Sequence, residues 1–392
     1  MKSIKSTVIL SLSVILLSVS LPFLINKLSE KIHLDTLKCK VSELKTHCIS
    51  MGKEDKTNGN TMDLQYEPIV KPFFLPPGHN EIQWVFENSE EIPPSSVKNP
   101  TQLPLPDSEI LSKIPYPENI EDNDGAIMTM QYGYYNTSAY FDLKNAGQVR
   151  NCTSIPNKTL AEISQIPPDI QIELNSDEPQ VLIYHSHATE SYEPYTRDFY
   201  DKDFSCKTTD ITKNMIAVGE EIVNELNNAG IHTLHDRTIH DYPSYNNAYN
   251  SSRNSVSEIL EKYPSIKVVL DIHRDGIERD DGTRIAPVCE VNGERVAQIM
   301  IISCCDDGGN IPLYKENFKL ASLLQSQLET DYSGITRPIL FDYRFYNQDL
   351  STGSLLIEIG SHGNSLSEAK LSGKLVGKSL SQALKNLCQP VD

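Results

Sequence analysis

The sequence predicts an α/β domain over residues 176–392, built on a mixed, largely parallel sheet that is flanked by helices. Short apolar runs alternate with segments in which apolar residues recur every three or four positions, as in strands that alternate with helices. In addition, three of the apolar runs end in histidine or glutamate, and open α/β sheets bind ligands at the carboxyl ends of their strands. A transmembrane helix and a proline-rich stalk are expected to precede this domain.

The first segment, residues 1–26, is predicted to contain the membrane anchor. Thr7 to Asn26 reads TVILSLSVILLSVSLPFLIN and carries no charge, and about 20 such residues span a bilayer as a helix. Lys2 and Lys5 precede this run and predict a cytoplasmic N-terminus. A retained anchor is favoured over a cleaved signal peptide, whose apolar region is typically about 7 to 15 residues. We therefore expect a single-pass protein of the cell membrane with an extracytoplasmic catalytic domain.

Residues 27–122 are predicted to form an extracytoplasmic linker or stalk, because turn-forming residues are frequent in FFLPPGHN, EIPPSSVKNP and TQLPLPDSEI. Residues 123–175 are predicted to form a small β-rich region of one or two strands, because aromatic and β-branched residues return there. The formal net charge of −18 argues against a nucleic-acid partner, whose phosphates would be repelled. The eight cysteines show no zinc-finger spacing, and their pairing cannot be deduced.

Within the predicted catalytic domain, the elements follow from apolar periodicity and from helix-capping residues. The first strand, 181–184, is followed by HSHATE, and a helix is expected to begin near Ile211 and to end before Gly230. His232 is expected on the solvent face of the next strand. The later expected elements are a strand at 231–234, a helix at 251–262, strands at 266–270 and 297–303, a helix at 316–329, a strand at 354–359, and a last helix opened by a Ser365/Glu368 capping box.

Three of these strand ends present the side chains of a zinc site. His187 and Glu190 follow the first strand, His273 follows the strand at 266–270, and Glu358 lies near the end of the strand at 354–359. Two histidines and a carboxylate make a three-ligand zinc site with a fourth position for water, whose pKa zinc lowers. We expect His187, Glu190 and His273 to bind zinc and Glu358 to act as the general base. This set of groups serves amide hydrolysis.

Several other residues compete for these roles. His185 competes with His187, because residues two apart in an extended segment point to the same side. Asp210 could replace Glu190 as the oxygen ligand, because it lies at the expected start of the first helix. Asp271 is expected to face away from the ring of His273. The weaker histidine candidates are His235, His240 and His362.

Other hydrolase classes explain the sequence less well. No GxSxG motif is present, and no serine stands at a strand-to-helix elbow, which argues against a serine hydrolase. A glycosidase needs two carboxylates across a cleft. Glu190 and Glu358 could serve, but the histidines would then have no role.

The segments PQVLIYHSHATESYEP, DIHRDG, RFYNQDLS and LLIEIGSHGNSLSEA, in this order between Asn151 and Asn386, resemble the stage II sporulation protein P family. That family comprises membrane-anchored peptidoglycan hydrolases of endospore-forming bacteria, similar to zinc-dependent N-acetylmuramoyl-L-alanine amidases. The resemblance implies an amidase-like fold, cleavage between N-acetylmuramic acid and L-alanine, and endopeptidase activity on stem peptides. It also implies action with stage II sporulation proteins D and M during engulfment of the forespore.

Carried over by motif, the resemblance puts His187 and His273 at the two zinc-histidine positions and Glu358 at the position of the catalytic glutamate. Related amidases place the zinc carboxylate near the start of the first helix, where this chain offers Asp210 and no glutamate. Glu190 lies within the motif itself and is the preferred ligand. The chain departs from the family pattern at Cys304, Cys305, Ser361 and His362.

Two alternative functions would not depend on a metal. The first is a degenerate amidase fold that binds the cell wall as a scaffold in a membrane complex, which has no need of a metal. The second is a lytic glycosidase, which would not depend on a metal and would produce new reducing ends.

Overall fold

The computed structural model of the chain describes residues 97 and 100–388. The predicted anchor, and the predicted stalk up to residue 96, lie outside the described residues. Within the described part of the chain, no helix is both long enough and apolar enough to cross a bilayer.

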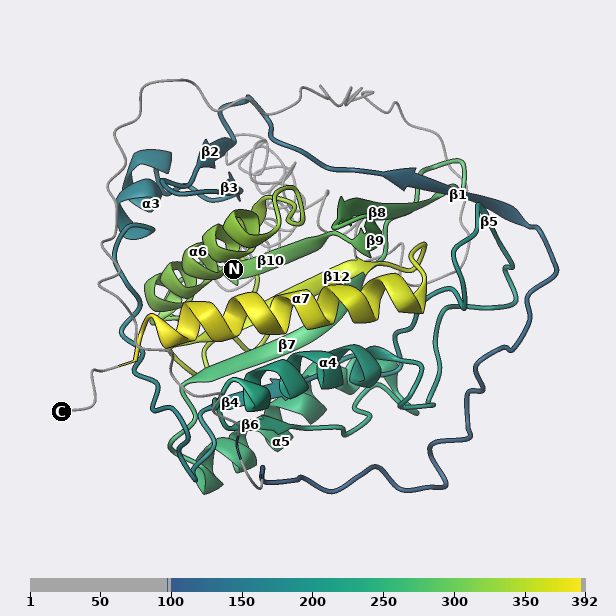
Figure 1. Ribbon diagram of the computed structural model, residues 1–392, viewed down its shortest axis with the longest axis horizontal. Coiled ribbons are helices and arrows are strands. Elements are labelled where there is room, and N and C mark those ends of the chain that lie inside the picture. Colours follow the sequence, from purple (N-terminus) through teal and green to yellow (C-terminus); the bar gives the residue numbers. More distant parts are fainter. Residues whose placement is uncertain (1–96, 98–99, 389–392) are drawn as a thin grey trace, which may run out of the picture. The chain divides into compact units, whose positions relative to one another are not determined.

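The described residues form a main sheet whose strands lie in the order β2-β3-β11-β10-β12-β7-β4-β6 (Figure 1). Strands β6, β4, β7 and β12 are parallel, and β10, β11 and β3 form a second parallel group that runs in the opposite direction. The predicted mixed, largely parallel sheet is therefore confirmed. Its strands are β2 (Tyr140–Asp142), β3 (Gln148–Asn151), β4 (Val181–Tyr184), β6 (Thr233–His235), β7 (Val268–Asp275), β10 (Ile299–Cys304), β11 (Ile339–Asp342) and β12 (Ser354–Ser361).

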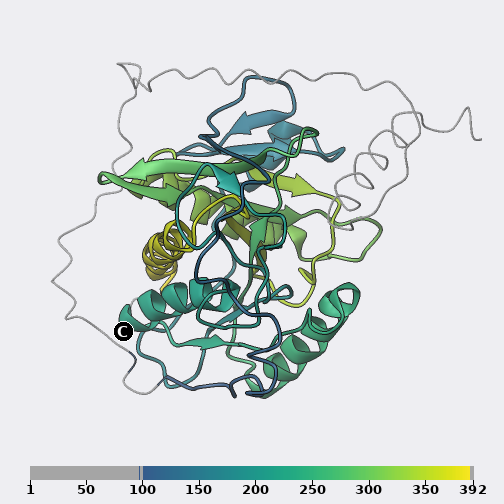
Figure 2. The ribbon, with the colours of Figure 1, turned by 90° about the vertical axis from the view of Figure 1, so that its right-hand side faces the viewer.

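Helices cover both faces of this sheet, and Figure 2 shows α5 on one side with α4 and α7 on the other. The alternation of strand side chains explains this arrangement. In β4, Val181 and Ile183 pack in one hydrophobic cluster with α4, whereas Leu182 and Tyr184 pack in another with α5. The helices are α3 (Asn157–Ile163), α4 (Met215–Asn228), the short 3-10 helix η1 (Tyr245–Asn247), α5 (Ala248–Lys262), α6 (Tyr314–Asp331) and α7 (Leu366–Lys385).

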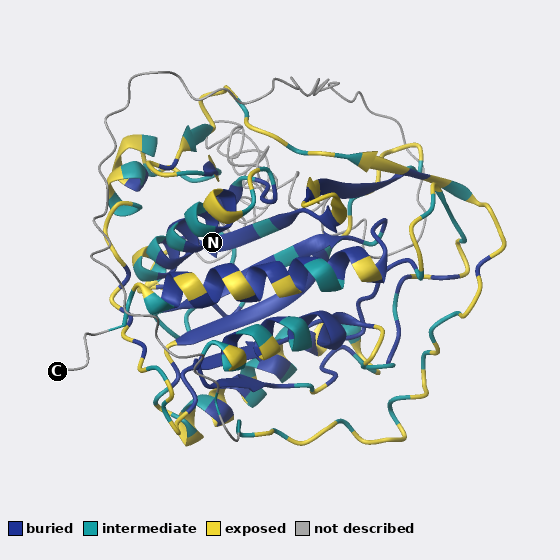
Figure 3. Ribbon diagram, in the orientation of Figure 1, coloured by how far each residue is buried: buried dark blue, intermediate teal, exposed yellow. Residues whose placement is uncertain are grey.

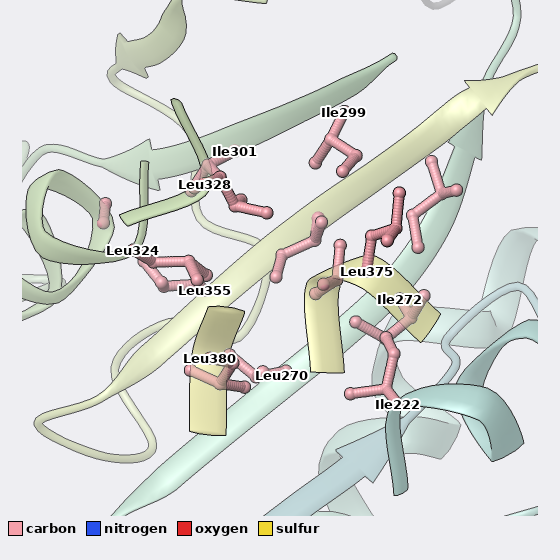
Figure 4. Close-up of a cluster of buried hydrophobic side chains, with 14 of the residues drawn as sticks. Ile222, Leu270, Ile272, Ile299, Ile301, Leu324, Leu328, Leu355, Leu375 and Leu380 are labelled. Atoms are coloured by element: carbon pink, nitrogen blue, oxygen red, sulfur yellow. The ribbon is translucent and has the colours of Figure 1, made fainter. Parts of the chain in front are cut away.

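The larger hydrophobic cluster joins the helices to the central strands. Leu375 of α7 and Ile222 of α4 lie beside Leu270 and Ile272 of β7 (Figure 4). Gly377 permits the close approach of α7 to α4, since a Cβ added there would lie 3.0 Å from the Ile222 backbone. Figure 3 shows that the central strands are buried along most of their length, whereas α7 alternates between buried and exposed residues. The core therefore fixes the positions of β7 and β12.

A smaller sheet has the order β5-β1-β8-β9. Strand β1 comes from the predicted β-rich region and pairs in parallel with β8, whereas β2 and β3 from the same region extend the main sheet beside β11. Residues 123–175 are thus shared between the two sheets. The strands of the smaller sheet are β1 (Gly125–Met130), β5 (Phe199–Tyr200), β8 (Arg284–Val291) and β9 (Glu294–Ala297).

Two expectations about individual residues are wrong. Helix α4 begins at Met215 rather than near Ile211, because the side chain of Asn214 caps it by accepting a hydrogen bond from Ile216 N. His232 is buried, with 1 % of its surface exposed, because its Nε2 accepts a hydrogen bond from Thr101 N at 2.9 Å. The Ser365/Glu368 capping box of α7 is present as predicted.

The last part of the predicted stalk contacts the catalytic domain. Ile114 exchanges backbone and side-chain hydrogen bonds with Thr209, and the hydroxyl of Tyr116 donates to Tyr192 O at 3.0 Å. Ile120 is buried in a small cluster with Phe204. Residues 110–120 therefore brace the loop that follows the HSHATE motif.

Candidate active site

The candidate site lies at the carboxyl ends of the parallel strands β4, β7 and β12. Glu358 of β12 and His273 of β7 are direct partners in the parallel register, so their side chains lie on the same side of the sheet. Tyr184, the last residue of β4, is opposite Asp271 of β7. The turn after β4 therefore carries His187 to the same edge, where its ring centroid lies 5.4 Å from that of His273.

Both ring nitrogens of His273 face acidic side chains. Nε2 lies 2.8 Å from Asp271 Oδ1 and 2.8 Å from Ser186 Oγ, and Nδ1 lies 3.7 Å from Glu190 Oε2. Burial alone would lower the pKa of His273, but the charge and hydrogen bond of Asp271, together with the charges of Glu190 and Glu358, raise it to about 10.

The expectation that Asp271 faces away from His273 is wrong. Residues two apart in a strand point to the same face, and β7 continues past both of them to Asp275. Asp271 also accepts hydrogen bonds from the backbone N and the Oγ of Ser186, both at 2.8 Å. It therefore fixes the first turn after β4 as well as the ring of His273.

His187 is enclosed by aromatic rings. Its ring stacks on Tyr245 with centroids 4.3 Å apart, and it meets Tyr249 edge-on at 5.2 Å. Nδ1 is buried and has no hydrogen-bond partner among the described residues. Asp241 Oδ2 lies 3.9 Å from this nitrogen, which is too far for a hydrogen bond. One nitrogen of His187 is thus left for a ligand.

His185 has a different environment. Its Nδ1 lies 2.9 Å from Ile272 O, its Nε2 lies 2.9 Å from His235 Nε2, and His235 Nδ1 lies 2.9 Å from Glu220 Oε2. Burial and the neighbouring His235 lower the pKa of His185 to about 3, so its ring is neutral. Both nitrogens of His185 are therefore occupied. The contacts of this histidine chain (His185, His235 and Glu220) connect the end of β4 to β6 and α4.

Of the two candidate carboxylate ligands, Glu190 and Asp210, only Glu190 lies near His273. Glu190 Oε2 lies near His273 Nδ1 and accepts a hydrogen bond of 3.4 Å from Arg274 N. The Asp210 carboxylate instead accepts from the backbone N and the Oγ1 of Thr212, at 2.9 and 2.7 Å, within the turn before α4. The structure thus brings Glu190, and not Asp210, to His273.

Two of the weaker histidine candidates have their neighbours elsewhere. His240 Nδ1 is hydrogen-bonded to Ser251 Oγ at 3.0 Å, and His362 Nε2 faces the carboxylate of Glu278 at 3.8 Å. Cys304 and Cys305 are buried free cysteines.

Glu358 has the environment of a proton-transfer group. Its Oε2 is buried and has no hydrogen-bond partner among residues 97 and 100–388. Burial and the charge of Asp275 raise the pKa of Glu358 to about 8, against the opposing charges of His273 and Arg337. A carboxylate whose pKa lies near neutrality can both accept and release a proton.

The catalytic group (His187, Glu190, His273 and Glu358) contains the donor types that zinc prefers. Tetrahedral zinc with bonds of about 2.0–2.2 Å holds its ligand atoms about 3.4 Å apart, close to the 3.7 Å between His273 Nδ1 and Glu190 Oε2. His187 adds a buried nitrogen without a partner among the described residues. No three metal-binding side chains of the described part are already gathered as a cluster, so closing the site requires side-chain movement. The donor types of these residues fit zinc, whereas their present spacing does not.

Several residues at the site were not singled out from the sequence as members of it. Ser186 could have been found from its place between the two histidines of HSH, and Asp271 from its position two residues before His273. Asp241 and Lys207 lie in loops and Tyr245 in the short helix η1, and none of these segments has a periodic pattern. The Nζ of Lys207 lies 3.8 Å from the ring centroid of Tyr245, which in turn covers His187.

With this geometry, comparison with known proteins identifies the family. The model of the stage II sporulation protein P family matches residues 110–381. The chain belongs to the stage II sporulation protein P family. The matched part begins at residue 110 and so includes the segment of the predicted stalk that braces the catalytic domain. The resemblance seen in the sequence is confirmed.

Individual relatives are more distant. Stage II sporulation protein P of Bacillus subtilis (strain 168) is 29 % identical over 205 residues, which are 49 % of this chain and 48 % of that protein. The chain thus matches about half the length of this curated member of the stage II sporulation protein P family.

Among solved structures, an N-acetylmuramoyl-L-alanine amidase of Nostoc punctiforme is 14 % identical, with a TM-score of 0.34 over 54 % of this chain and 97 % of that one. An amidase of Clostridioides difficile, solved with a lipoprotein, is 16 % identical, with a TM-score of 0.32 over 52 % of this chain and 94 % of that one. TM-scores of this size do not establish a common fold.

Proposed function

We propose that this chain is a membrane-anchored peptidoglycan hydrolase of sporulation. It hydrolyses the amide between N-acetylmuramic acid and L-alanine in a zinc-dependent reaction, and it also acts as an endopeptidase on stem peptides. Membership of the stage II sporulation protein P family supports a role in sporulation and peptidoglycan as the substrate. The single observation that carries the chemistry is the meeting of His187, Glu190 and His273 with Glu358, whose Oε2 is buried.

In this proposal, His187, His273 and Glu190 hold the zinc ion. When bound, zinc supplies a water of lowered pKa and a Lewis acid for the substrate carbonyl. Glu358 accepts the proton of the attacking water and delivers it to the leaving amine, because its Oε2 has no competing partner among the described residues. Burial raises the pKa of Glu358 above the ordinary value for a carboxyl, which favours its uptake of a proton from that water.

Neighbouring residues orient the proposed ligands. Asp271 and Ser186 hold Nε2 of His273, which directs its Nδ1 toward Glu190. A histidine that binds a metal generally has its other nitrogen held by a carboxylate in this way. The stacked Tyr245 keeps water from one face of the His187 ring.

The proposal extends to location and partners. Residues 1–26 anchor the protein in the cell membrane. The stalk of residues 27–122, whose last part packs on the catalytic domain, presents that domain to peptidoglycan outside the cytoplasm. The protein acts with stage II sporulation proteins D and M when the mother-cell membrane engulfs the forespore.

The test is digestion of purified peptidoglycan by the full chain in detergent, with the products identified by mass spectrometry. We expect stem peptides with a free L-alanine amino group and intact glycan strands, loss of activity in EDTA, and its return with zinc. New reducing ends that form in the presence of EDTA would instead identify a lytic glycosidase. Absence of both cleavage and bound zinc would identify a wall-binding scaffold.

A further inference from the structure

Arg337 is a buried arginine, and only one of its side-chain nitrogens has a hydrogen-bond partner in the part of the chain that the structure describes. It is 6 % exposed, and its Nη1 donates to Asp275 Oδ2 at 2.9 Å. Its Nε and Nη2 are buried and have no hydrogen-bond partner among the described residues. Buried donors are nearly always bonded in folded proteins, so two adjacent exceptions on one cation require an explanation.

The two free nitrogens lie on the same edge of the guanidinium. Nε and Nη2 point two N–H groups in parallel, with the spacing of the two oxygens of a carboxylate. Arg197 provides a contrast, because its buried nitrogens without a partner in the described part are Nε and Nη1, which belong to different edges. Arg337 therefore presents a complete two-donor edge.

This edge lies beside the catalytic group. Asp275, which holds Nη1, ends β7 two residues after His273 and is on the same face of the strand. In the neighbouring strand, Ser361 lies opposite Asp275 and Glu358 lies opposite His273. The positive charge of Arg337 also acts on the pKa of Glu358, which it lowers against the larger effect of burial. The guanidinium is therefore close to the reacting groups.

The surroundings of Arg337 are held rigidly. Gln298, which is fully buried, accepts from Tyr132 N at 2.7 Å and donates to Tyr132 O at 2.9 Å and to Gly334 O at 2.8 Å. The backbone N of Arg337 donates to Ile299 O at 2.7 Å. The ring of Tyr132 consequently lies against the guanidinium, with 5.6 Å between Cζ and the ring centroid. The side chain of Asp275 is 27 % exposed, so this group of residues reaches the surface.

We propose that the Nε/Nη2 edge of Arg337 binds the α-carboxylate of the stem glutamate, next to the bond that is cleaved. This inference rests on the proposed function, since it names the part of the substrate that the same site recognises. A carbonyl oxygen would accept from one N–H, whereas a carboxylate accepts from both and carries the complementary charge. Among the described residues Asp275 bonds only Nη1, so the Nε/Nη2 edge keeps both of its N–H groups for a carboxylate.

The experiment compares two muropeptides that differ only in whether the α-carboxyl group of the stem glutamate is free or amidated. The full chain should cleave the free acid with a kcat/KM about tenfold to a hundredfold higher, through a lower KM, as loss of a charged hydrogen-bonded pair predicts. Arg337→Gln should raise KM for the free acid to the level of the amide and leave the amide unchanged. Arg337→Lys, which keeps the charge but loses the paired donors, should be intermediate.

The matched control is Arg253→Lys. The guanidinium of Arg253 already donates to both oxygens of Asp349, at 2.7 and 2.6 Å, so this change should alter the kinetics of neither muropeptide. Equal cleavage of both muropeptides by the unaltered chain would overturn the proposal, whether or not Arg337→Gln folds. An equal loss of kcat on both muropeptides in Arg337→Gln would also overturn it and would leave Arg337 a structural role toward Asp275.

Binding separates this inference from the proposed function. In Glu358→Gln, which should not turn over, calorimetry should give a Kd for the free acid that is lower than that for the amide by a similar factor. If the unaltered chain cleaves neither muropeptide, the proposed function fails, while the difference in Kd still decides whether Arg337 binds a carboxylate. Equal Kd values would contradict the role of Arg337 even if cleavage occurs.

Discussion

Two groups of polar side chains, most of them buried, meet at the turn after β4, and they differ in how their hydrogen bonds are satisfied. In the histidine chain, both nitrogens of His185 have partners, and His235 connects the chain to Glu220. In the catalytic group, His187 Nδ1 and Glu358 Oε2 have no hydrogen-bond partner among the described residues. Buried polar atoms without partners are costly, so a protein retains them where a ligand or a reaction uses them. Residues 185 and 187 thus have different roles although they lie two positions apart.

The largest effect is expected for the general base. Glu358→Gln removes the proton acceptor but keeps the shape of the side chain, so turnover of peptidoglycan should fall by about a hundredfold to ten-thousandfold. Zinc content, measured on the same preparation, should not change. Loss of zinc in Glu358→Gln would instead show that Glu358 is a zinc ligand and not the general base.

The next effect concerns the zinc carboxylate. Glu190→Gln should weaken zinc binding and reduce cleavage, because Glu190 Oε2 is the oxygen beside His273 Nδ1. Asp210→Asn is the matched control and should bind zinc as the unaltered chain does, since the Asp210 carboxylate is bonded to Thr212. Zinc affinity is measured by competition with a chelator. The reverse pattern would assign the ligand to Asp210.

A smaller effect on zinc binding is expected from Asp271, which holds the ring of His273 in place. Asp271→Asn keeps a hydrogen bond to Ser186 but loses the negative charge beside His273 Nε2. Zinc affinity should fall by about tenfold to a hundredfold, as for other carboxylates that hold a ligand histidine. Unchanged affinity, with a loss of thermal stability alone, would show that Asp271 only connects β4 and β7.

The smallest effect is expected on stability, from the hydrogen-bonded carboxylate of Asp236. Burial opposes ionisation of Asp236, but His240 and hydrogen bonds from Ser255 and Thr238 lower the pKa of the carboxyl below its ordinary value. A lowered pKa in the folded state contributes stability above the pKa of the unfolded chain, about 3.9, and this contribution is lost as the pH falls through the folded value.

Asp236→Asn should therefore reduce the free energy of unfolding by about 1–3 kcal/mol at neutral pH. The difference from the unaltered chain should become smaller as the pH falls below about 4. Urea unfolding between neutral and acidic pH measures this difference. A difference that does not depend on pH would mean that packing, and not the charge, is responsible.

Local patterns in the sequence predicted the parts of the fold that are determined locally. The apolar run at 181–184 and the Ser365/Glu368 box are encoded within a few residues, and the structure has both as predicted. Strands β8 and β9 were not predicted, because β8 contains Pro287 and β9 begins with charged residues, so neither has a clear period of two. The burial of His232 depends on Thr101, which is 131 residues away in the chain.

The same distinction applies to the site. His187, Glu190, His273 and Glu358 follow strands, and a parallel sheet brings the ends of its strands together, so their meeting was predictable. Asp241 and Arg337 come from a loop and from the approach to β11, and no spacing in the sequence places them beside β7. Their roles depend on tertiary contacts.

The most direct test of the central claim is the zinc content of the full chain and of two variants that differ only in which histidine of HSH is removed. We expect one zinc ion per chain in the unaltered protein, none in His187→Ala, and one in His185→Ala, in which the histidine chain is broken and thermal stability alone is reduced. Zinc retained in His187→Ala and lost in His185→Ala would contradict the account.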